Sequence, residues 1–184
     1  AVATLAAAEN AMRRAGLDLA EAQIGVIGLG AAGTAIARML SGHSQHPVLG
    51  FDPNPEAQAR LTAGGGVIAE SLGAVMASAE LVIAVSGRAG LIPRELVRKG
   101  QGILALTNPH PEIEVEDALA AGAAFAADGR SVNNLLGFPG ILRAALDVRA
   151  RRITPGMYLA AAHAIGSHAQ ENELVPNPLR RDVH

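Results

Sequence analysis

The chain of 184 residues contains no cysteine and no tryptophan, and aromatic residues make up only 2 % of it. Without cysteine, disulfide bonds and thiolate metal sites are excluded. With so few aromatic rings, the core must consist of aliphatic side chains, which are available because hydrophobic residues make up 49 % of the chain. At this length, one aliphatic core is large enough to support a globular domain.

The chain also lacks an excess of charge of either sign. Lys and Arg together number 15, Asp and Glu number 17, and the net charge is −2. The arginines are scattered, so neither nucleic acid nor an anionic membrane is favoured as a partner. No apolar run reaches the length of a membrane span, and no signal peptide is recognisable. We therefore expect a cytoplasmic protein.

Short apolar runs alternate with helical patterns along most of the chain. This alternation predicts a Rossmann-type, doubly wound α/β fold with a mainly parallel sheet and helices on both faces. We expect one domain over 1–184, with 1–22 as a leading helix and 170–184 as an irregular tail. The predicted strands are 23–28, 48–51, 67–68, 81–85, 103–106 and 123–127. The predicted helices are 2–15, 31–41, 53–61, 71–78, 93–99, 114–121, 139–149 and 154–169.

The most informative segment is Ile-Gly-Val-Ile-Gly-Leu-Gly-Ala-Ala-Gly over 24–33. A strand pattern leads into Gly-x-Gly-x-x-Gly, and a helical pattern follows, as in a dinucleotide-binding fingerprint. Gly28 permits the tight turn, Gly30 lets the backbone approach a pyrophosphate, and Gly33 lets the helix pack closely on the sheet. Ala31 and Ala32 begin the helix, whose free N–H groups and partial positive charge suit phosphate.

An acidic residue completes the fingerprint. Asp52 follows Gly30 after 22 positions and ends the second predicted strand. Its carboxylate would accept hydrogen bonds from the adenosine ribose and repel a 2′-phosphate, so we expect NAD rather than NADP. Pro53, next in the chain, is included in this predicted site. Arg60 leaves NADP open, because a nearby cation can reach a 2′-phosphate.

Polar residues follow the other predicted strands, where ligands bind in open α/β sheets. Ser86 and Gly87 follow 81–85, Asn108 follows 103–106, and Asn133 comes soon after the last strand. We predict that all four contact the cofactor, although such loops also collect turn residues and helix caps.

Several polar groups receive no chemical role from the sequence. The acidic residues of 112–117, including Glu112, crowd a predicted helix start, where they favour the helix dipole. The histidines lack acidic partners at ligand spacing, so we expect no metal site. No catalytic residue is assigned.

The chain resembles the cofactor-binding domain of malic enzymes, in particular the shorter bacterial type. The resemblance covers essentially the whole chain and rests on 28–38, 107–113 (Thr-Asn-Pro-His-Pro-Glu-Ile), 132–148 and 174–178. It implies NAD-dependent oxidative decarboxylation of malate to pyruvate. It also implies that Asn108 and Asn133 lie near the nicotinamide and its ribose, and that Asn134 reaches the malate carboxylate.

The family pattern also implies parts that this chain does not supply. In the family, another domain contributes a Tyr and a Lys for proton transfer and acidic ligands for Mg²⁺ or Mn²⁺. Here Tyr158 lies on the last predicted helix and Lys99 ends a surface helix, and the loop at Ser131 is shorter than is usual. We therefore expect NAD binding without malate turnover. Metal and a small dicarboxylic acid are expected only in a complete enzyme, together with a missing catalytic domain or a homo-oligomer.

Two alternatives stay open. The domain could belong to another hydroxy-acid or amino-acid dehydrogenase whose substrate half is a separate chain. It could also be a non-catalytic dinucleotide-sensing or interaction module, in which case the helix 2–15 would be exposed or paired with another copy.

Overall fold

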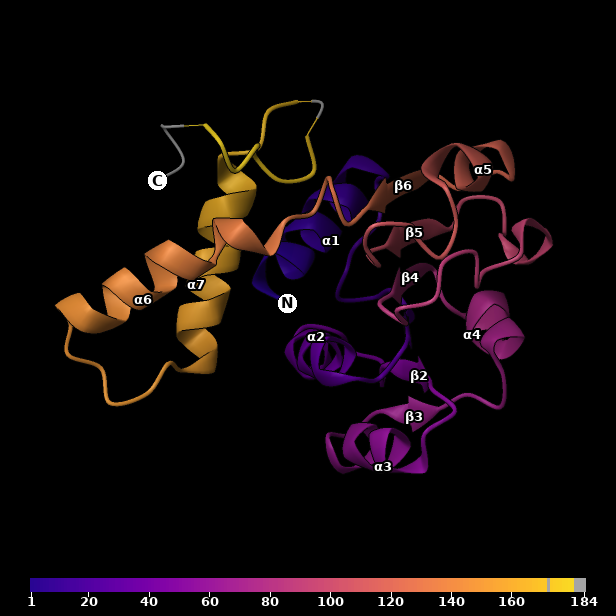
Figure 1. Ribbon diagram of the computed structural model, residues 1–184, viewed down its shortest axis with the longest axis horizontal. Coiled ribbons are helices and arrows are strands. Elements are labelled where there is room, and N and C mark those ends of the chain that lie inside the picture. Colours follow the sequence, from indigo (N-terminus) through magenta and orange to yellow (C-terminus); the bar gives the residue numbers. More distant parts are fainter. Residues whose placement is uncertain (172, 181–184) are drawn as a thin grey trace.

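The computed structural model describes residues 1–171 and 173–180, with only the backbone of Asn134 described (Figure 1). A six-stranded parallel sheet forms its centre, in the order β3-β2-β1-β4-β5-β6. The strands are β1 (Ile24–Ile27), β2 (Leu49–Phe51), β3 (Val67–Ile68), β4 (Leu81–Ala84), β5 (Gly102–Ala105) and β6 (Phe125–Asp128). This is the strand order of the Rossmann fold, and the predicted fold class is confirmed.

In the described residues, seven α-helices and two short 3-10 turns precede, connect or follow the strands. The α-helices are α1 (Val2–Arg14), α2 (Ala31–Ser41), α3 (Pro55–Ala63), α4 (Leu72–Ser78), α5 (Val115–Ala120), α6 (Phe138–Asp147) and α7 (Pro155–Ser167). The 3-10 turns are η1 (Arg94–Leu96) and η2 (Asn134–Leu136). From 170 to 180, the described residues form turns and bends rather than helix or strand.

Helix caps explain where several helices begin. The Asn54 side chain accepts a hydrogen bond from the Glu56 N–H, so α3 begins at Pro55 rather than at Pro53. Ser71 caps α4 and Thr154 caps α7 in the same way. These are the residue types that satisfy the free N–H groups of a first turn.

The helix predicted over 93–99 is wrong. Only the single 3-10 turn η1 forms there. Val97 turns extended (φ −72°, ψ 125°) and is buried in the core beside α4 and α5. Gly100 then adopts a left-handed φ of +82°. The burial of Val97 and the turn at Gly100 leave too few residues for an α-helix.

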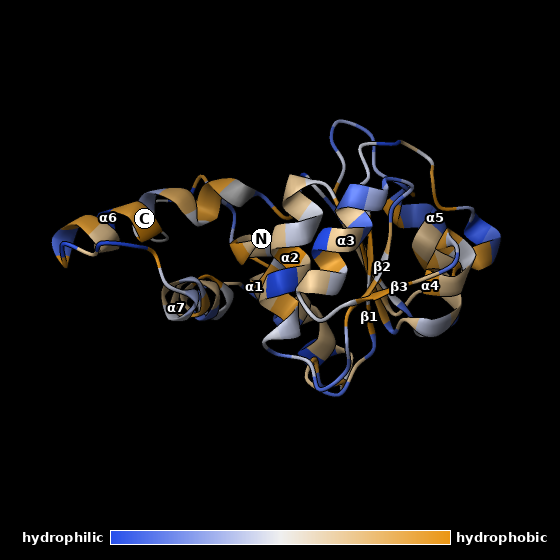
Figure 2. Ribbon diagram, turned by 90° about the horizontal axis from the view of Figure 1, so that it is seen from below, coloured by the Kyte–Doolittle hydropathy of each residue, from blue (hydrophilic) through white to orange (hydrophobic). Residues whose placement is uncertain are grey.

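The sheet has a separate apolar layer on each face, as Figure 2 shows for α2 and α3 on one side and α4 and α5 on the other. Along β4, Leu81 and Ile83 pack into the cluster that also holds α1, α2 and α3. Val82 and Ala84 pack into the opposite cluster with α4 and α5. Neighbouring residues of a strand face opposite ways, so a strand that is apolar throughout supplies both layers.

Helix α1 is buried along most of its length. It packs on α7 and α2, so the exposed or self-paired helix considered for an interaction module is wrong. Its run of small alanine side chains lets neighbouring helices approach closely. The buried Asn10 makes polar contacts in this layer: its amide donates to the carbonyls of Gly166 (3.0 Å) and Leu174 (2.8 Å).

Within the described residues, no helix combines the length and the apolar character needed to cross a bilayer.

Replacing Asn10 should weaken the attachment of the C-terminal segment to α1, which Arg14 also holds through the carbonyls of Gln170 and Glu173. We expect Asn10→Ala to lower the free energy of unfolding by about 1–3 kcal/mol, because the carbonyls of Gly166 and Leu174, both partly buried, lose their donor. Urea denaturation measures the loss. Gln45→Ala is the matched control, since this side chain is exposed, and it should change the stability by less than about 0.5 kcal/mol. Equal losses in both variants would contradict the assignment.

Candidate cofactor site

The turn after β1 and the start of α2 admit no side chain at Gly28 or at Gly33. Gly28 has a φ of +90°, and a Cβ there would lie 2.6 Å from the Cα of Ser86. A Cβ on Gly33 would lie 1.8 Å from the carbonyl oxygen of Gly28. Helix α2 therefore starts in direct contact with the turn, which is the close packing that the fingerprint predicts.

Gly30 lies in open space instead. Its backbone is extended (φ −64°, ψ −164°), and a Cβ would meet no atom within 4 Å. Gly30 is the N-cap of α2, and no side chain caps the helix. Ala31 and Ala32, which follow, are exposed. An uncapped helix start with open space before it suits a phosphate group, which accepts hydrogen bonds from N–H groups.

Asp52 lies against the glycine turn. Its Oδ2 accepts a hydrogen bond from the Leu29 N–H (2.7 Å), and its Oδ1 accepts one from the Asn54 N–H (2.8 Å). The Thr34 hydroxyl donates to the carbonyl of Leu29 (2.8 Å) from the other side. The sequence placed Asp52 near a ribose but did not predict that its carboxylate also fixes the turn. Pro53 follows as an exposed residue.

The loops after β4 and β5 are joined by Glu112, whose side chain is fully buried. Its Oε1 accepts hydrogen bonds from the Ser86 N–H (2.7 Å), the Ser86 hydroxyl (2.8 Å) and the Thr107 hydroxyl (2.6 Å). The Thr107 hydroxyl in turn accepts a bond from the Gly87 N–H (2.9 Å). The dipole role predicted for Glu112 is therefore wrong, because its carboxylate is used by these loops. The flanking Pro111 and Ile113, both buried, were the available signal.

The loops after β5 and β6 also touch. The Asn108 amide lies over Gly129, where a Cβ would come within 2.4 Å of its Nδ2. The Arg130 guanidinium donates to the Pro109 carbonyl (3.2 Å). With the contacts above, these links join the loops that follow β2, β1, β4, β5 and β6 at the carboxyl edge of the sheet, from Asp52 to Arg130.

Asp128 organises the turn after β6. Its partial burial works to raise the pKa of the carboxyl. The Ser131 N–H and hydroxyl, the Arg130 N–H and the Arg130 charge outweigh burial and hold the pKa below its usual range. The carboxyl stabilises the fold while ionised, and this contribution is lost as pH falls through the lowered pKa.

The asparagine pair differs from the other loops. The Asn133 Oδ1 accepts a hydrogen bond from the Leu135 N–H (2.9 Å), so it caps η2. Asn133 is exposed, and its cofactor role stays a prediction. The side chain of Asn134, predicted to contact substrate, lies outside the described part of the structure.

The profile of the NAD-binding domain of 6-phosphogluconate dehydrogenase matches residues 23–120, which hold the glycine turn, Asp52 and Glu112. The chain belongs to this NAD-binding domain family.

Its full-length similarity is to malic enzymes. The NAD-dependent malic enzyme 1 of Bacillus subtilis is 52 % identical over the whole chain, which covers 42 % of that protein. The crystal structures of malic enzymes from Thermotoga maritima and Pyrococcus horikoshii both have TM-scores of 0.85. Their identities are 30 % and 32 %, with 99 % and 100 % of this chain covered. The chain spans about half the length of these relatives, 54 % and 50 % respectively for the two structures. The resemblance to malic enzymes is confirmed.

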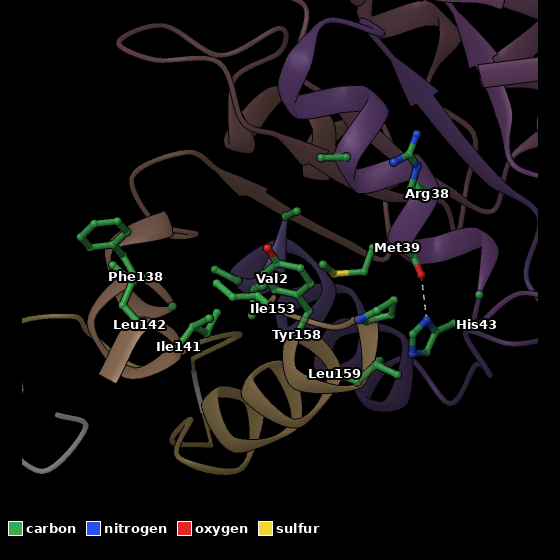
Figure 3. Close-up of a pocket in the computed structure, with 16 residues that line it drawn as sticks. Val2, Arg38, Met39, His43, Phe138, Ile141, Leu142, Ile153, Tyr158 and Leu159 are labelled. Carbon is green, nitrogen blue, oxygen red and sulfur yellow. Dashed lines mark hydrogen bonds between the residues drawn. The ribbon is translucent and has the colours of Figure 1, made fainter. Parts of the chain in front are cut away.

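We call the carboxyl edge of the sheet, where the predicted cofactor contacts lie, the cofactor edge. Lys99 and Tyr158 both lie away from it. Lys99 comes just before β5 begins, at the amino edge of the sheet. Tyr158 lines a cavity between α1, α2, α6 and α7 (Figure 3). In the segments 1–171 and 173–180, no group of three or more His, Asp or Glu could hold a metal ion.

That cavity has a volume of about 800 Å³ and is mainly apolar. In Figure 3, Phe138, Ile141 and Leu142 of α6 lie across from Met39 of α2 and from His43, which follows that helix. None of the residues predicted to bind the cofactor lines it. The cavity is therefore separate from the cofactor edge.

Alanine substitutions at Gly33 and Gly30 should have different effects on stability. Gly33→Ala should lower the free energy of unfolding by about 1–3 kcal/mol, because its Cβ collides with backbone. Gly30→Ala should change it by less than about 0.5 kcal/mol, because its Cβ enters open space. Urea denaturation of the two variants gives the comparison. If the Gly30 variant were as unstable as the Gly33 variant, the conclusion that a Cβ on Gly30 meets open space would be wrong.

Proposed function

We propose that the chain binds NAD along the carboxyl edge of its sheet and forms the cofactor half of a malic-enzyme-like oxidoreductase. The observation that carries this proposal is the open space in front of Gly30, at the uncapped start of α2 and beside Asp52. The family match and the malic enzyme relatives support the same ligand.

The proposed contacts divide into two groups along the edge. The pyrophosphate is bound at the glycine turn and the start of α2, through Gly28, Gly30, Ala31, Ala32 and Gly33. Asp52 and Pro53 take the adenosine ribose. The nicotinamide half lies toward the loops after β4, β5 and β6, which carry Ser86, Gly87, Asn108 and Asn133. The Asn134 side chain remains the candidate contact for a substrate carboxylate.

When bound, NAD supplies a hydride acceptor. The residues of this chain bind and orient it. Decarboxylating malate to pyruvate further needs a base for the hydroxyl proton, a Lewis-acid metal and an acid for the enolate. We propose that a further polypeptide supplies these parts, with Mg²⁺ or Mn²⁺, because Lys99 and Tyr158 lie away from the edge.

An apolar surface favours such a partner. Helix α6 extends away from the sheet (Figure 2) and has no buried residue. Phe138 is 66 % exposed, Leu146 74 % and Val148 70 %. Exposed apolar patches of this kind mark interaction sites. We propose that a catalytic domain, or a second copy in a homo-oligomer, packs on α6 and fills the cavity beneath it. The complete enzyme would act in the cytoplasm.

Calorimetric titration tests cofactor choice. The chain should bind NAD, and NADP more weakly. Gly30→Val should weaken NAD binding by at least about tenfold, because a branched side chain occupies the space for the pyrophosphate. Asp52→Asn should reduce the preference for NAD over NADP by about tenfold, because the charge that repels a 2′-phosphate is gone. A folded chain that binds neither dinucleotide would refute the proposal.

Turnover tests whether the chain is only the cofactor half. With NAD, malate and Mn²⁺, the isolated chain should form no NADH measurable by absorbance, because proton transfer and metal binding lie elsewhere. A full-length malic enzyme is the positive control. Malate-dependent NADH formation by the isolated chain would overturn the assignment. NAD binding with no turnover, even with a malic enzyme's catalytic domain added, would favour a sensing or interaction module.

A further inference from the structure

Glu112 is a buried carboxylate that lies close to the cofactor edge. Its side chain is 0 % exposed. Besides the three bonds to its Oε1 described above, its Oε2 accepts a longer one from the Thr107 N–H (3.3 Å). Every recorded donor to the carboxylate belongs to Ser86 or Thr107. Because burying a carboxylate is costly unless it is hydrogen-bonded, these two residues must stay where they can serve it.

The backbone carries the same connection at Glu112 and at the residue before it. The Ile92 N–H donates to the Glu112 carbonyl (2.9 Å), and the Gly90 N–H donates to the Pro111 carbonyl (3.0 Å). The loop that begins at Ser86 is therefore attached at both ends to the segment that carries Glu112. The carboxylate sits at the end nearest the sheet, where both loops leave their strands.

These bonds also orient two hydroxyl groups. The Ser86 and Thr107 hydroxyls both give their protons to Glu112. Each accepts one loop N–H, from Arg88 (3.1 Å) and from Gly87 (2.9 Å) respectively. A hydroxyl oxygen accepts two hydrogen bonds, so each keeps acceptor capacity and no free donor. A carboxamide NH₂ complements such a pair of acceptors.

We propose that Glu112 is a positioning residue for the nicotinamide half of the cofactor site. It holds the loops after β4 and β5 at a fixed separation and turns their hydroxyl oxygens into acceptors for a ring carboxamide. The inference rests on the proposed binding of NAD, and it deepens that proposal by assigning the second half of the ligand to these loops. Asp52 and the glycine turn hold the first half, and the Asp52 carboxylate is hydrogen-bonded to Leu29 and Asn54 rather than to the loops that Glu112 joins.

The test compares NAD with ADP-ribose, which lacks the nicotinamide ring. Calorimetry gives both dissociation constants for the wild type, Glu112→Gln, Thr107→Val and Thr107→Ser. Thr107→Val keeps the shape but removes the hydroxyl, and Thr107→Ser retains it. Glu114→Gln, at an exposed position, is the matched control.

We expect Glu112→Gln and Thr107→Val to weaken NAD binding by about tenfold and to leave ADP-ribose binding within about twofold of the wild type. Thr107→Ser and Glu114→Gln should retain NAD binding. The selective loss matters, because a general destabilisation weakens both ligands equally. Thermal denaturation of each variant verifies folding.

Three results would overturn the inference. These are an equal loss for both ligands, no loss in Thr107→Val, or a wild type that binds ADP-ribose as tightly as NAD. If Glu112→Gln does not fold, the comparison of Thr107→Val with Thr107→Ser still tests the inference. A wild type that binds neither ligand refutes the proposed function itself, and so the two failures are distinguishable.

Discussion

The close approach of α2 to the turn after β1 is the constraint on which the cofactor edge depends. A Cβ at Gly33 would lie 1.8 Å from the Gly28 carbonyl, so the helix can start there only if the side chain is hydrogen. This contact aims the uncapped start of α2 at the space beside Gly30. It also presents the Leu29 N–H to Asp52. The uncapped helix start and the acidic residue thus share one turn.

Two carboxylates, those of Asp52 and Glu112, link the loops at this edge by hydrogen bonds. Asp52 bonds N–H groups of Leu29 and Asn54, and it is half-buried, so it remains accessible to a ligand. Glu112 is fully buried and bonds only the loops themselves. The physical logic is the same, because an acceptor with several lone pairs can join loops whose N–H groups lack partners. The difference in burial separates a residue that can touch the cofactor from one that positions others.

The C-terminal helices follow a different rule. Helix α7 belongs to the core layer through α1, and Asn10 and Glu9 of α1 make polar contacts with it. Helix α6 contributes no buried residue and borders the apolar cavity. Most of its apolar side chains, such as Phe138 and Leu146, are therefore exposed in the described structure.

By itself, the sequence determined the fold class, the glycine turn and the acidic residue of the fingerprint. Each of these follows from local rules: strand and helix periodicity, the conformational freedom of Gly28, and the spacing to Asp52. Only the tertiary structure decided the rest. Burial of Val97 reduced a predicted helix to η1, and a cap at η2 engaged Asn133. Glu112 moved from a predicted helix-dipole role to a buried link between two loops. These outcomes depend on contacts between segments distant in the chain, which local patterns do not encode.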